Sequence, residues 1–231
     1  MLASLVNAGP APSVIKLLPS DGAAGDEFGV DVDISQGRAI VGSRFNDDAG
    51  ENSGSAYLFN AETGSQLHKL TANDAAAGDW FGISAAISGT TAVVGAYQND
   101  ARGNNAGAAY VFDATTGTQL RKLTATDAAP GDNLGITAAI DGNLAIFGAY
   151  LDDNRGSAYV FNTTTGQQVR KLAPVDLSTQ AFFGAAVDIA GNLALIGANA
   201  DDAQGNASGS AYLYNVSTGA RLFKLLPDDG G

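Results

Sequence analysis

The stretch Gly54-Ser-Ala-Tyr-Leu-Phe59 is one of four near copies in this sequence. It returns as Gly107-Ala-Ala-Tyr-Val-Phe112, as Gly156-Ser-Ala-Tyr-Val-Phe161 and as Gly209-Ser-Ala-Tyr-Leu-Tyr214. In each copy two aromatic residues stand two positions apart, which places both rings on one face of a β-strand. A sequence that returns at a regular spacing predicts a repeat architecture, in which each copy forms one supersecondary unit.

Two further markers repeat in register with this stretch. Lys-Leu pairs start at Lys16, Lys69, Lys122, Lys171 and Lys224, so consecutive pairs are 53, 53, 49 and 53 residues apart. A Phe-Gly or Leu-Gly pair starts 12 residues after each of the first four lysines, at Phe28, Phe81, Leu134 and Phe183. The units are therefore 16–68, 69–121, 122–170 and 171–223. They form an array over 14–226, which leaves 1–13 as an N-terminal extension and 227–231 as a C-terminal tail.

Each unit predicts four short antiparallel strands. In the second unit these are residues 83–87, 91–95, 108–113 and 119–124, which are rich in Val, Ile, Tyr, Phe, Thr or Ala and are bounded by turn residues. A four-stranded antiparallel unit repeated at about 50 residues is typical of a β-propeller blade. We therefore expect an all-β fold, a propeller of four blades. The small residues of each first strand would lie innermost, and the aromatic residues of each third strand would pack between blades.

The same residues resemble a known family. Phe-Gly at the first strand, Gly42-Ser43 or Gly95-Ala96 ending the second, and Gly-Ser-Ala-Tyr opening the third are similar to FG-GAP repeats, the blades of integrin α-subunit propellers and of many bacterial surface proteins. The resemblance implies a binding or adhesion module. Integrin-type blades carry an Asp-x-Asp-x-Asp-Gly calcium loop between strands one and two. Here that connection is a tight turn with at most one acid, Asp141, so those ligands do not carry over. The chain looks closer to the bacterial variant, whose Asp-rich stretch follows Gly-Ala.

Composition excludes several classes of function. The chain has 24 acidic and 12 basic residues, a net charge of -12, which argues against nucleic acid or an anionic membrane surface as a partner. No apolar run approaches the roughly 18 residues of a membrane span, so none is expected. Because the chain has no Cys, disulfides, thiolate metal sites and thiol catalysis are excluded.

The sequence offers no catalytic constellation. Its only histidine, His68, takes a position that the other units fill with Arg121, Arg170 or Phe223, so it replaces surface-type residues. The acids recur in every unit instead of converging at one place. We therefore predict that the protein is not an enzyme. Two alternatives stay open: a lyase or hydrolase acting on a polysaccharide or small molecule at the propeller axis, and a structural assembly unit.

The acidic residues concentrate in loops. Sixteen of the 24 lie in the loops between the second and third strands or between units, which should emerge on one face where Arg44, Arg102 and Arg155 are the clear counter-charges. Asp carboxylates suit hard cations, so this face could bind calcium. It could also be an acidic docking surface, or its Asp and Asn side chains could simply cap local backbone N–H groups. The candidate calcium ligands are Asp47, Asp48, Asp100, Asp152, Asp153, Asp201 and Asp202.

The two ends of the array carry one outer strand too many. Residues 14–18 and 222–226 each predict an outer strand, so five such strands serve four blades. An unpaired strand edge invites another chain. We expect either a longer array or self-association through the terminal strands, in preference to a closed four-bladed ring. The expected partner is a protein or glycan ligand on a cell surface, and the expected location is extracellular or at the surface of a bacterial cell.

Calcium binding leads to a direct test. A cation that binds only the folded state raises the unfolding midpoint by mass action. Thermal unfolding in excess calcium should therefore have a higher midpoint than unfolding in chelator at matched ionic strength. Coincident curves would leave the loop acids as turn-forming residues.

Overall fold

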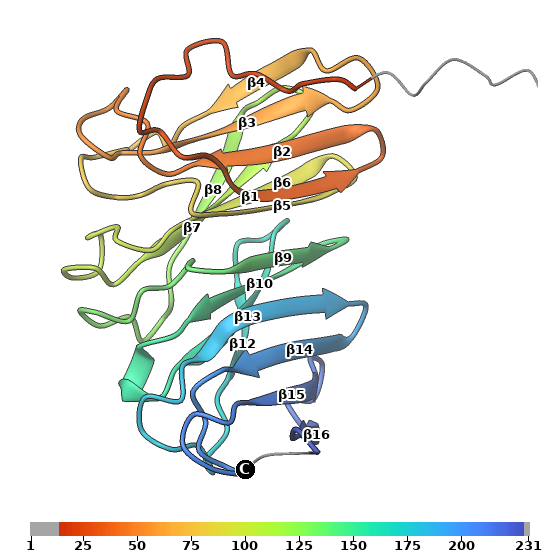
Figure 1. Cartoon of the computed structure of the whole chain (residues 1–231). Coiled ribbons are helices and arrows are strands. Elements are labelled where there is room, and N and C mark those ends of the chain that lie inside the picture. The colour runs from red at the N-terminus through yellow and green to blue at the C-terminus, as the bar shows by residue number, and fades with distance from the viewer. Residues whose placement is uncertain (1–13, 229–231) are drawn as a thin grey trace, which may run out of the picture.

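The computed structural model describes residues 14–228, so the extension 1–13 and residues 229–231 of the tail lie outside the description. Sixteen strands form four antiparallel sheets of four strands, each in sequence order (Figure 1), which confirms the all-β propeller architecture. Blade 1 contains β1 (Phe28–Ser35), β2 (Arg38–Ser43), β3 (Ser55–Asn60) and β4 (Gln66–Leu70). Blade 2 contains β5 (Ser84–Ser88), β6 (Thr91–Ala96), β7 (Ala108–Asp113) and β8 (Gln119–Leu123). Blade 3 contains β9 (Ala138–Asp141), β10 (Leu144–Ala149), β11 (Ser157–Asn162) and β12 (Gln168–Leu172), with a short 3-10 helix at Asp152–Asn154. Blade 4 contains β13 (Phe183–Ala190), β14 (Leu193–Ala198), β15 (Ser210–Asn215) and β16 (Arg221–Leu225). Within the described residues, no helix is long and apolar enough to cross a membrane.

Strand register is the same in every blade. In blade 1, Val41 pairs with Tyr57, and Tyr57 pairs with Lys69 on its other side. The register between the third and fourth strands shifts directly after Leu58, and the equivalent shift occurs in the other three blades. A shared register gives the four blades the same inner, outer and facing positions, so residues one repeat apart can be compared directly.

The core lies between blades. Phe81 packs edge to face on Tyr110 and Phe112 of its own blade, with ring centroids 5.5 and 5.8 Å apart. These rings bury Ile40 and Leu58 of blade 1 completely. Equivalent clusters join blade 2 to blade 3 and blade 3 to blade 4. The aromatic residues thus do what the sequence indicates, and burial of this apolar surface is the main favourable term holding the blades together.

Blade 3 fills its part of the core differently. Leu134 stands where the other three blades have the Phe of Phe-Gly, and Phe147 stands where blades 1 and 2 have Val41 and Val94. The Phe147 ring packs on Phe161 at 6.0 Å, so the aromatic ring reaches the cluster from the second strand instead of the first. The change conserves volume, which is the kind of substitution that packed cores tolerate.

Main chains of neighbouring blades approach closely at glycines. The N–H of Phe81 donates to the carbonyl of Ser53 in blade 1, at 3.0 Å. At this junction the carbonyl oxygens of Phe81 and Gly82 lie where side chains on Gly54 and Gly42 would begin. A β-carbon at either of these two glycines would collide with main-chain atoms, so the contact requires glycine.

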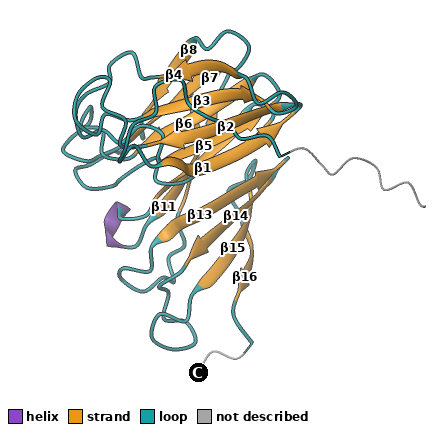
Figure 2. Ribbon diagram, turned by 45° about the horizontal axis from the view of Figure 1, so that its top comes forward, coloured by secondary structure: helices purple, strands orange, loops and turns teal. Residues whose placement is uncertain are grey.

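The array does not close on itself. Within the described residues, blades 1 and 2, 2 and 3, and 3 and 4 share interfaces of this kind, whereas β1 and β13 do not. Blades 1 and 4 lie at the two ends of the array (Figure 2). The prediction of a fifth outer strand is wrong, because residues 14–18 form no strand. An outer strand pairs with the third strand of its own blade, and the described residues contain no blade before blade 1 that could supply one. Instead, Leu17 packs on Val41, Tyr57 and Phe59 of blade 1.

The inter-blade core makes a quantitative prediction. Leu58→Ala removes a side chain that is 0% exposed between two blades and should lower the free energy of unfolding by about 2–5 kcal/mol. Leu67→Ala, one strand away at a side chain that is 39% exposed, should change it by no more than about 0.5 kcal/mol. Urea unfolding of both variants checks this. Equal losses would mean that the blade interface does not carry the stability assigned to it.

Candidate functional site

The two sets of acidic loops lie side by side on one face, on the left of Figure 1, as the sequence analysis expects. Backbone hydrogen bonds join them. The N–H groups of Gly78 and Trp80, in the loop between blades 1 and 2, donate to the carbonyls of Glu51 and Asn52 at 2.9 and 3.2 Å. Similar bonds occur at the next two blade junctions. We call this surface the loop face.

Each blade places its own lysine ammonium among these acids. In blade 1, the Tyr57 hydroxyl donates to Asp21 at 3.0 Å, and Lys69 contacts the carboxylates of Asp21 and Asp48. In blade 2, Lys122 and Tyr110 both bind Asp74, at 2.5 and 3.0 Å. Blade 3 repeats the arrangement with Lys171 and Asp127. In blade 4, Lys224 pairs with Asp201, and the equivalent loop acid Asp176 pairs with Arg221. The expectation that only three arginines serve as counter-charges is therefore wrong, because the lysines of the Lys-Leu pairs reach the loop face from the fourth strands.

Blades 3 and 4 strengthen this cluster with a buried carboxylate. Asp152 and Asp201 take the position that Asn46 and Asn99 hold in the first two blades. Lys224 lies 2.9 Å from Asp201, whose side chain is 2% exposed. The same carboxylate accepts hydrogen bonds from Ser210 and Tyr212 at 2.7 and 3.1 Å. A buried charge needs partners of this kind, and here a cation and two hydroxyls supply them.

The pKa values follow from these contacts. Burial would raise the pKa of the Asp21 and Asp201 carboxyls, but the hydrogen bonds from Lys69 and Lys224 hold both pKa values below their usual range. The pKa of Lys69 is raised, because hydrogen bonds to Asp21 and Asp48 outweigh burial. Burial, followed by the hydrogen bond to Asp21, raises the pKa of Tyr57 to about 12. At neutral pH Asp21, Asp201 and Lys69 are therefore ionised, and Tyr57 is neutral.

The seven candidate calcium ligands divide into two groups. Asp48, Asp152, Asp153 and Asp201 face lysines, whereas Asp47, Asp100 and Asp202 accept backbone N–H bonds at 2.7 Å from the residue five positions on in their own loops. Among the residues described, no three His, Asp or Glu side chains form a group that could hold a metal ion. A calcium ion at the first group would have to compete with lysine ammonium groups for its ligands, and calcium binding stays a prediction.

Sequence reasoning missed a row of aromatic side chains on the loop face. Trp80, from the loop before β5, packs edge to face on Phe45 and Tyr97, with centroids 4.8 and 5.4 Å apart. The Arg44 guanidinium lies over the Phe45 and Trp80 rings and pairs with Glu27 at 2.7 Å. All three rings are only partly buried, and none belongs to the clusters between blades. Tyr150 and Phe182 make a second, similar pair at the junction of blades 3 and 4.

Two of these residues have an unusual backbone conformation. Trp80 and Phe182 each directly precede a Phe-Gly pair and have φ angles of 55° and 57°, in the left-handed region. Bulky residues rarely adopt it. The equivalent residues Glu27 and Asn133 have φ angles of 51° and 61°, so the conformation belongs to the repeat and only the side chain that it carries changes. The blades differ at this point, with Glu27, Trp80, Asn133 and Phe182 in turn. That variation before an otherwise regular Phe-Gly is the signal by which the sequence could have revealed the row.

The propeller axis is lined by small and acidic residues. The inner strands of all four blades surround a groove of about 430 Å³. Asp31 and Asp33 of β1 border it, but their carboxylates accept the N–H groups of Ala85 and Ile87 at 2.8 Å. Burial raises the pKa of Asp31. The main task of these acids is to satisfy backbone groups at the edge of the next blade's inner strand, which is a structural role.

Comparison with known families agrees with this geometry. FG-GAP repeats match residues 13–59, 65–112, 118–161 and 167–214. The chain belongs to the FG-GAP repeat family. Among solved structures, this FG-GAP protein is similar to the crystal structure of the computationally designed Ika4 protein. The TM-score is 0.56 at 16% identity, covering 88% of this chain and 99% of that one, so the likeness concerns the fold. No curated protein matches the chain.

The cluster of blade 4 predicts a pH dependence. The pKa of Asp201 is lowered in the folded state, so its contribution to stability is present above about pH 3.9, the unfolded value, and is lost as pH falls through the folded pKa. The pKa of Lys224 is raised, so its contribution is lost as pH rises above about 10.4. Lys224→Met should therefore lower the free energy of unfolding at neutral pH and make less difference at pH 3. Urea unfolding of wild type and variant at both pH values measures this, and a difference independent of pH would contradict it.

Proposed function

We propose that this FG-GAP propeller is a non-enzymatic binding or adhesion module that acts outside the cell and takes a protein or glycan ligand on its loop face. The observation that carries the proposal is the aromatic row of Phe45, Trp80 and Tyr97. These rings are partly exposed and lie outside the cores between blades. Aromatic side chains combine a large apolar surface with little conformational freedom, which suits them to anchor a ligand.

The setting of the row supports this role. Binding residues commonly lie on loops that a rigid scaffold positions, and here hydrogen bonds between adjacent loops fix each one at its blade junction. The row combines residues from blade 1, the blade 1–2 connection and blade 2, so its shape depends on the packed propeller. Around it, exposed carboxylates such as Asp47 and Asp100 make the rim acidic. An acidic rim favours a neutral glycan or a basic protein segment over an anionic ligand.

Trp80 is the only tryptophan of the chain, so its fluorescence reports on the row directly. Wild-type protein would be screened on arrays of glycans and of extracellular proteins, and any ligand found would be titrated while Trp80 emission is followed. We expect the emission to change on binding. Trp80→Ala should weaken binding by about tenfold or more, as truncation of a central aromatic anchor does.

The matched control is Leu120→Ala. This side chain is 51% exposed on β8 and lies away from the aromatic row, so binding should be unchanged. Thermal unfolding of both variants establishes that each is folded. The proposal fails if wild type binds no probe on either array, or if folded Trp80→Ala binds as tightly as wild type.

A further inference from the structure

Three times along the chain, a blade docks onto the preceding one in the same way. The Phe-Gly or Leu-Gly pair that opens a blade, which we call the plug, lies over two glycines of the preceding blade, which we call the socket. Plug Phe81–Gly82 fills socket Gly42 and Gly54, where a β-carbon would collide with plug carbonyl oxygens. Likewise, Leu134–Gly135 fills Gly95 and Gly107, and Phe183–Gly184 fills Gly148 and Gly156.

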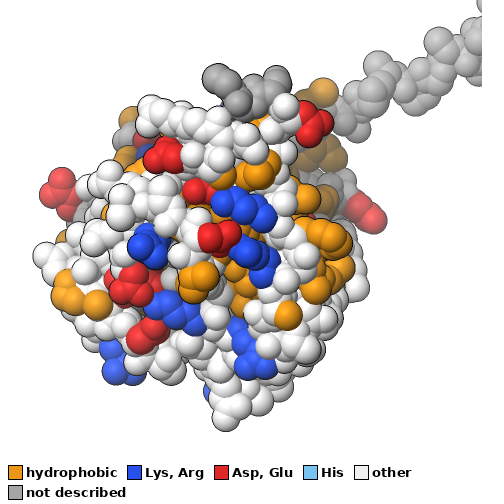
Figure 3. Space-filling view, turned by 90° about the horizontal axis from the view of Figure 1, so that it is seen from below, with side chains coloured by type: hydrophobic (Ala, Val, Ile, Leu, Met, Phe, Trp, Pro, Cys, Tyr) orange, Lys and Arg blue, Asp and Glu red, His pale blue; other side chains and the backbone are white. Residues whose placement is uncertain are grey.

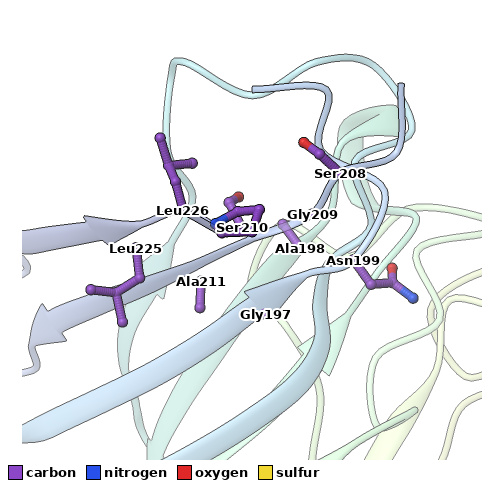
Figure 4. Close-up of a pocket in the computed structure, with 10 residues that line it drawn as sticks. Gly197, Ala198, Asn199, Ser208, Gly209, Ser210, Ala211, Leu225 and Leu226 are labelled. Carbon is purple, nitrogen blue, oxygen red and sulfur yellow. The ribbon is translucent and has the colours of Figure 1, made fainter. Parts of the chain in front are cut away.

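Within residues 14–228, no plug lies over the socket of blade 4. A β-carbon at Gly197 would meet Ala186 at 3.4 Å and one at Gly209 would meet Asn199 at 3.4 Å, both within blade 4. A groove of about 460 Å³ lies at this point, bordered by the two glycines and Leu225 (Figure 4).

The sheet face around this groove is apolar and open. The equivalents of Leu195 and Leu225 in the first three blades are at most 2% exposed, namely Ile40, Val93 and Ile146 and then Leu70, Leu123 and Leu172. In blade 4, Leu195 is 41% exposed and Leu225 50%. Figure 3 views the molecule from the end where blade 4 lies and shows hydrophobic side chains at the surface there.

The plug of blade 1, Phe28–Gly29, likewise lies over no socket among the described residues. A β-carbon at Gly29 would meet nothing within 4 Å, whereas at Gly82 it would collide with the carbonyl oxygen of Ser55 in the preceding blade. The described chain therefore ends in one free plug and one free socket. The two belong to the same repeating interface and are complementary in shape.

The interface between blades also contains a hydrogen bond from an inner-strand N–H group to an Asp carboxylate of the preceding blade, and blade 4 has the equivalent Asp. At the first junction, Asp33 accepts its own strand's Ile34 N–H through one oxygen and the N–H of Ile87 in blade 2 through the other, at 2.7 and 2.8 Å. Asp188 is the equivalent residue of blade 4 and accepts the N–H of Ile189 at 2.8 Å through one oxygen. In a docked blade 1 the residue equivalent to Ile87 is Ile34, whose N–H already bonds Asp33 and would be shared with the second oxygen of Asp188.

The outer edge shows the same match. At the three internal junctions His68, Arg121 and Arg170 bond a carbonyl in the turn of the following blade, at 2.9, 2.7 and 3.1 Å. The equivalent residue of blade 4 is Phe223, which is 61% exposed and cannot donate. On blade 1, the place of that residue is taken by Ile15, which packs on Gly64 as His68 packs on Gly117. Phe223 and Ile15 are thus both apolar at a position that carries a hydrogen-bonding side chain at the internal junctions.

The sequence repeats at this junction. Ile15-Lys-Leu-Leu-Pro-Ser-Asp-Gly22 and Phe223-Lys-Leu-Leu-Pro-Asp-Asp-Gly230 differ at only two positions, the first and the sixth. Leu17 contacts the Val41, Tyr57 and Phe59 cluster of blade 1, just as Leu70 contacts the equivalent cluster of blade 2. Residues 14–18 therefore occupy, on blade 1, the position that the fourth strand of a preceding blade takes at the other junctions.

We propose that blade 4 of one chain docks onto blade 1 of a second copy, with plug Phe28–Gly29 entering socket Gly197 and Gly209, and that two such contacts close a ring of eight blades. In this ring β16 of each chain replaces residues 14–18 of the other on blade 1. Each copy supplies one plug and one socket, so a two-fold axis satisfies both and leaves no open edge. Eight blades lie within the range that propellers adopt.

Sedimentation of the chain tests this proposal. Wild type should sediment as a closed dimer of twice 23.3 kDa. Gly197→Ala should sediment as a monomer, because the new β-carbon is accommodated within blade 4 but blocks the incoming carbonyl. Leu195→Asp should have the same effect by placing a charge on the docking face.

The control for Leu195→Asp is Leu67→Asp. Leu67 is 39% exposed, close to the 41% of Leu195, and it lies on β4 of blade 1, away from the open face of blade 4. This variant should stay dimeric. A wild-type monomer, a series of larger open oligomers, or a Gly197→Ala variant that remains dimeric would each overturn the proposal.

Discussion

The rest of the structure depends on one close contact, in which the main-chain carbonyls of a Phe-Gly pair lie directly over two glycines of the preceding blade. This contact fixes the distance between two sheets to what bare backbone allows. At that distance the aromatic residues of one blade reach the aliphatic residues of the other, and the loops at the same end come within hydrogen-bonding range. Core, loop face and aromatic row are therefore consequences of a single steric constraint.

Acidic side chains in the loops of each blade are paired with a lysine of the same blade. A net charge of -12 concentrated in loops on one face would repel itself, but each fourth strand delivers a lysine into the middle of its own acids. The tyrosine of the third strand supports the same cluster through its hydroxyl while its ring packs in the core. One residue thus links the apolar and the ionic parts of a blade. The loop face therefore carries fewer unpaired carboxylates than its count of acidic residues indicates.

The sequence was sufficient to predict the blades because their signals are local and repeated. The predicted strand 108–113 is β7 itself, 91–95 and 119–124 differ from β6 and β8 by one residue at one end, and 83–87 is displaced from β5 by one residue. The lysine clusters were not predicted, since Lys69 and Asp21 are 48 positions apart and only the fold shows that they meet. The aromatic row was missed for a different reason. Trp80 and Phe45 lie in irregular loops, where spacing carries no information about neighbours. Residues 14–18 have a strand-like sequence but no partner strand, and pairing is what makes a strand.

The exchange of Leu134 and Phe147 in blade 3 has a wider meaning. One large ring and one aliphatic side chain are required at the meeting point of the first two strands, yet either strand can supply the ring. The residue types by which the repeat is recognised in the sequence are therefore not themselves what the fold requires. A blade can lose the aromatic residue of its Phe-Gly pair and still pack on the neighbouring blade, provided that a residue of its second strand supplies the missing side-chain volume. What the fold preserves is therefore the combined side-chain volume at two neighbouring positions, and not the residue type at either one.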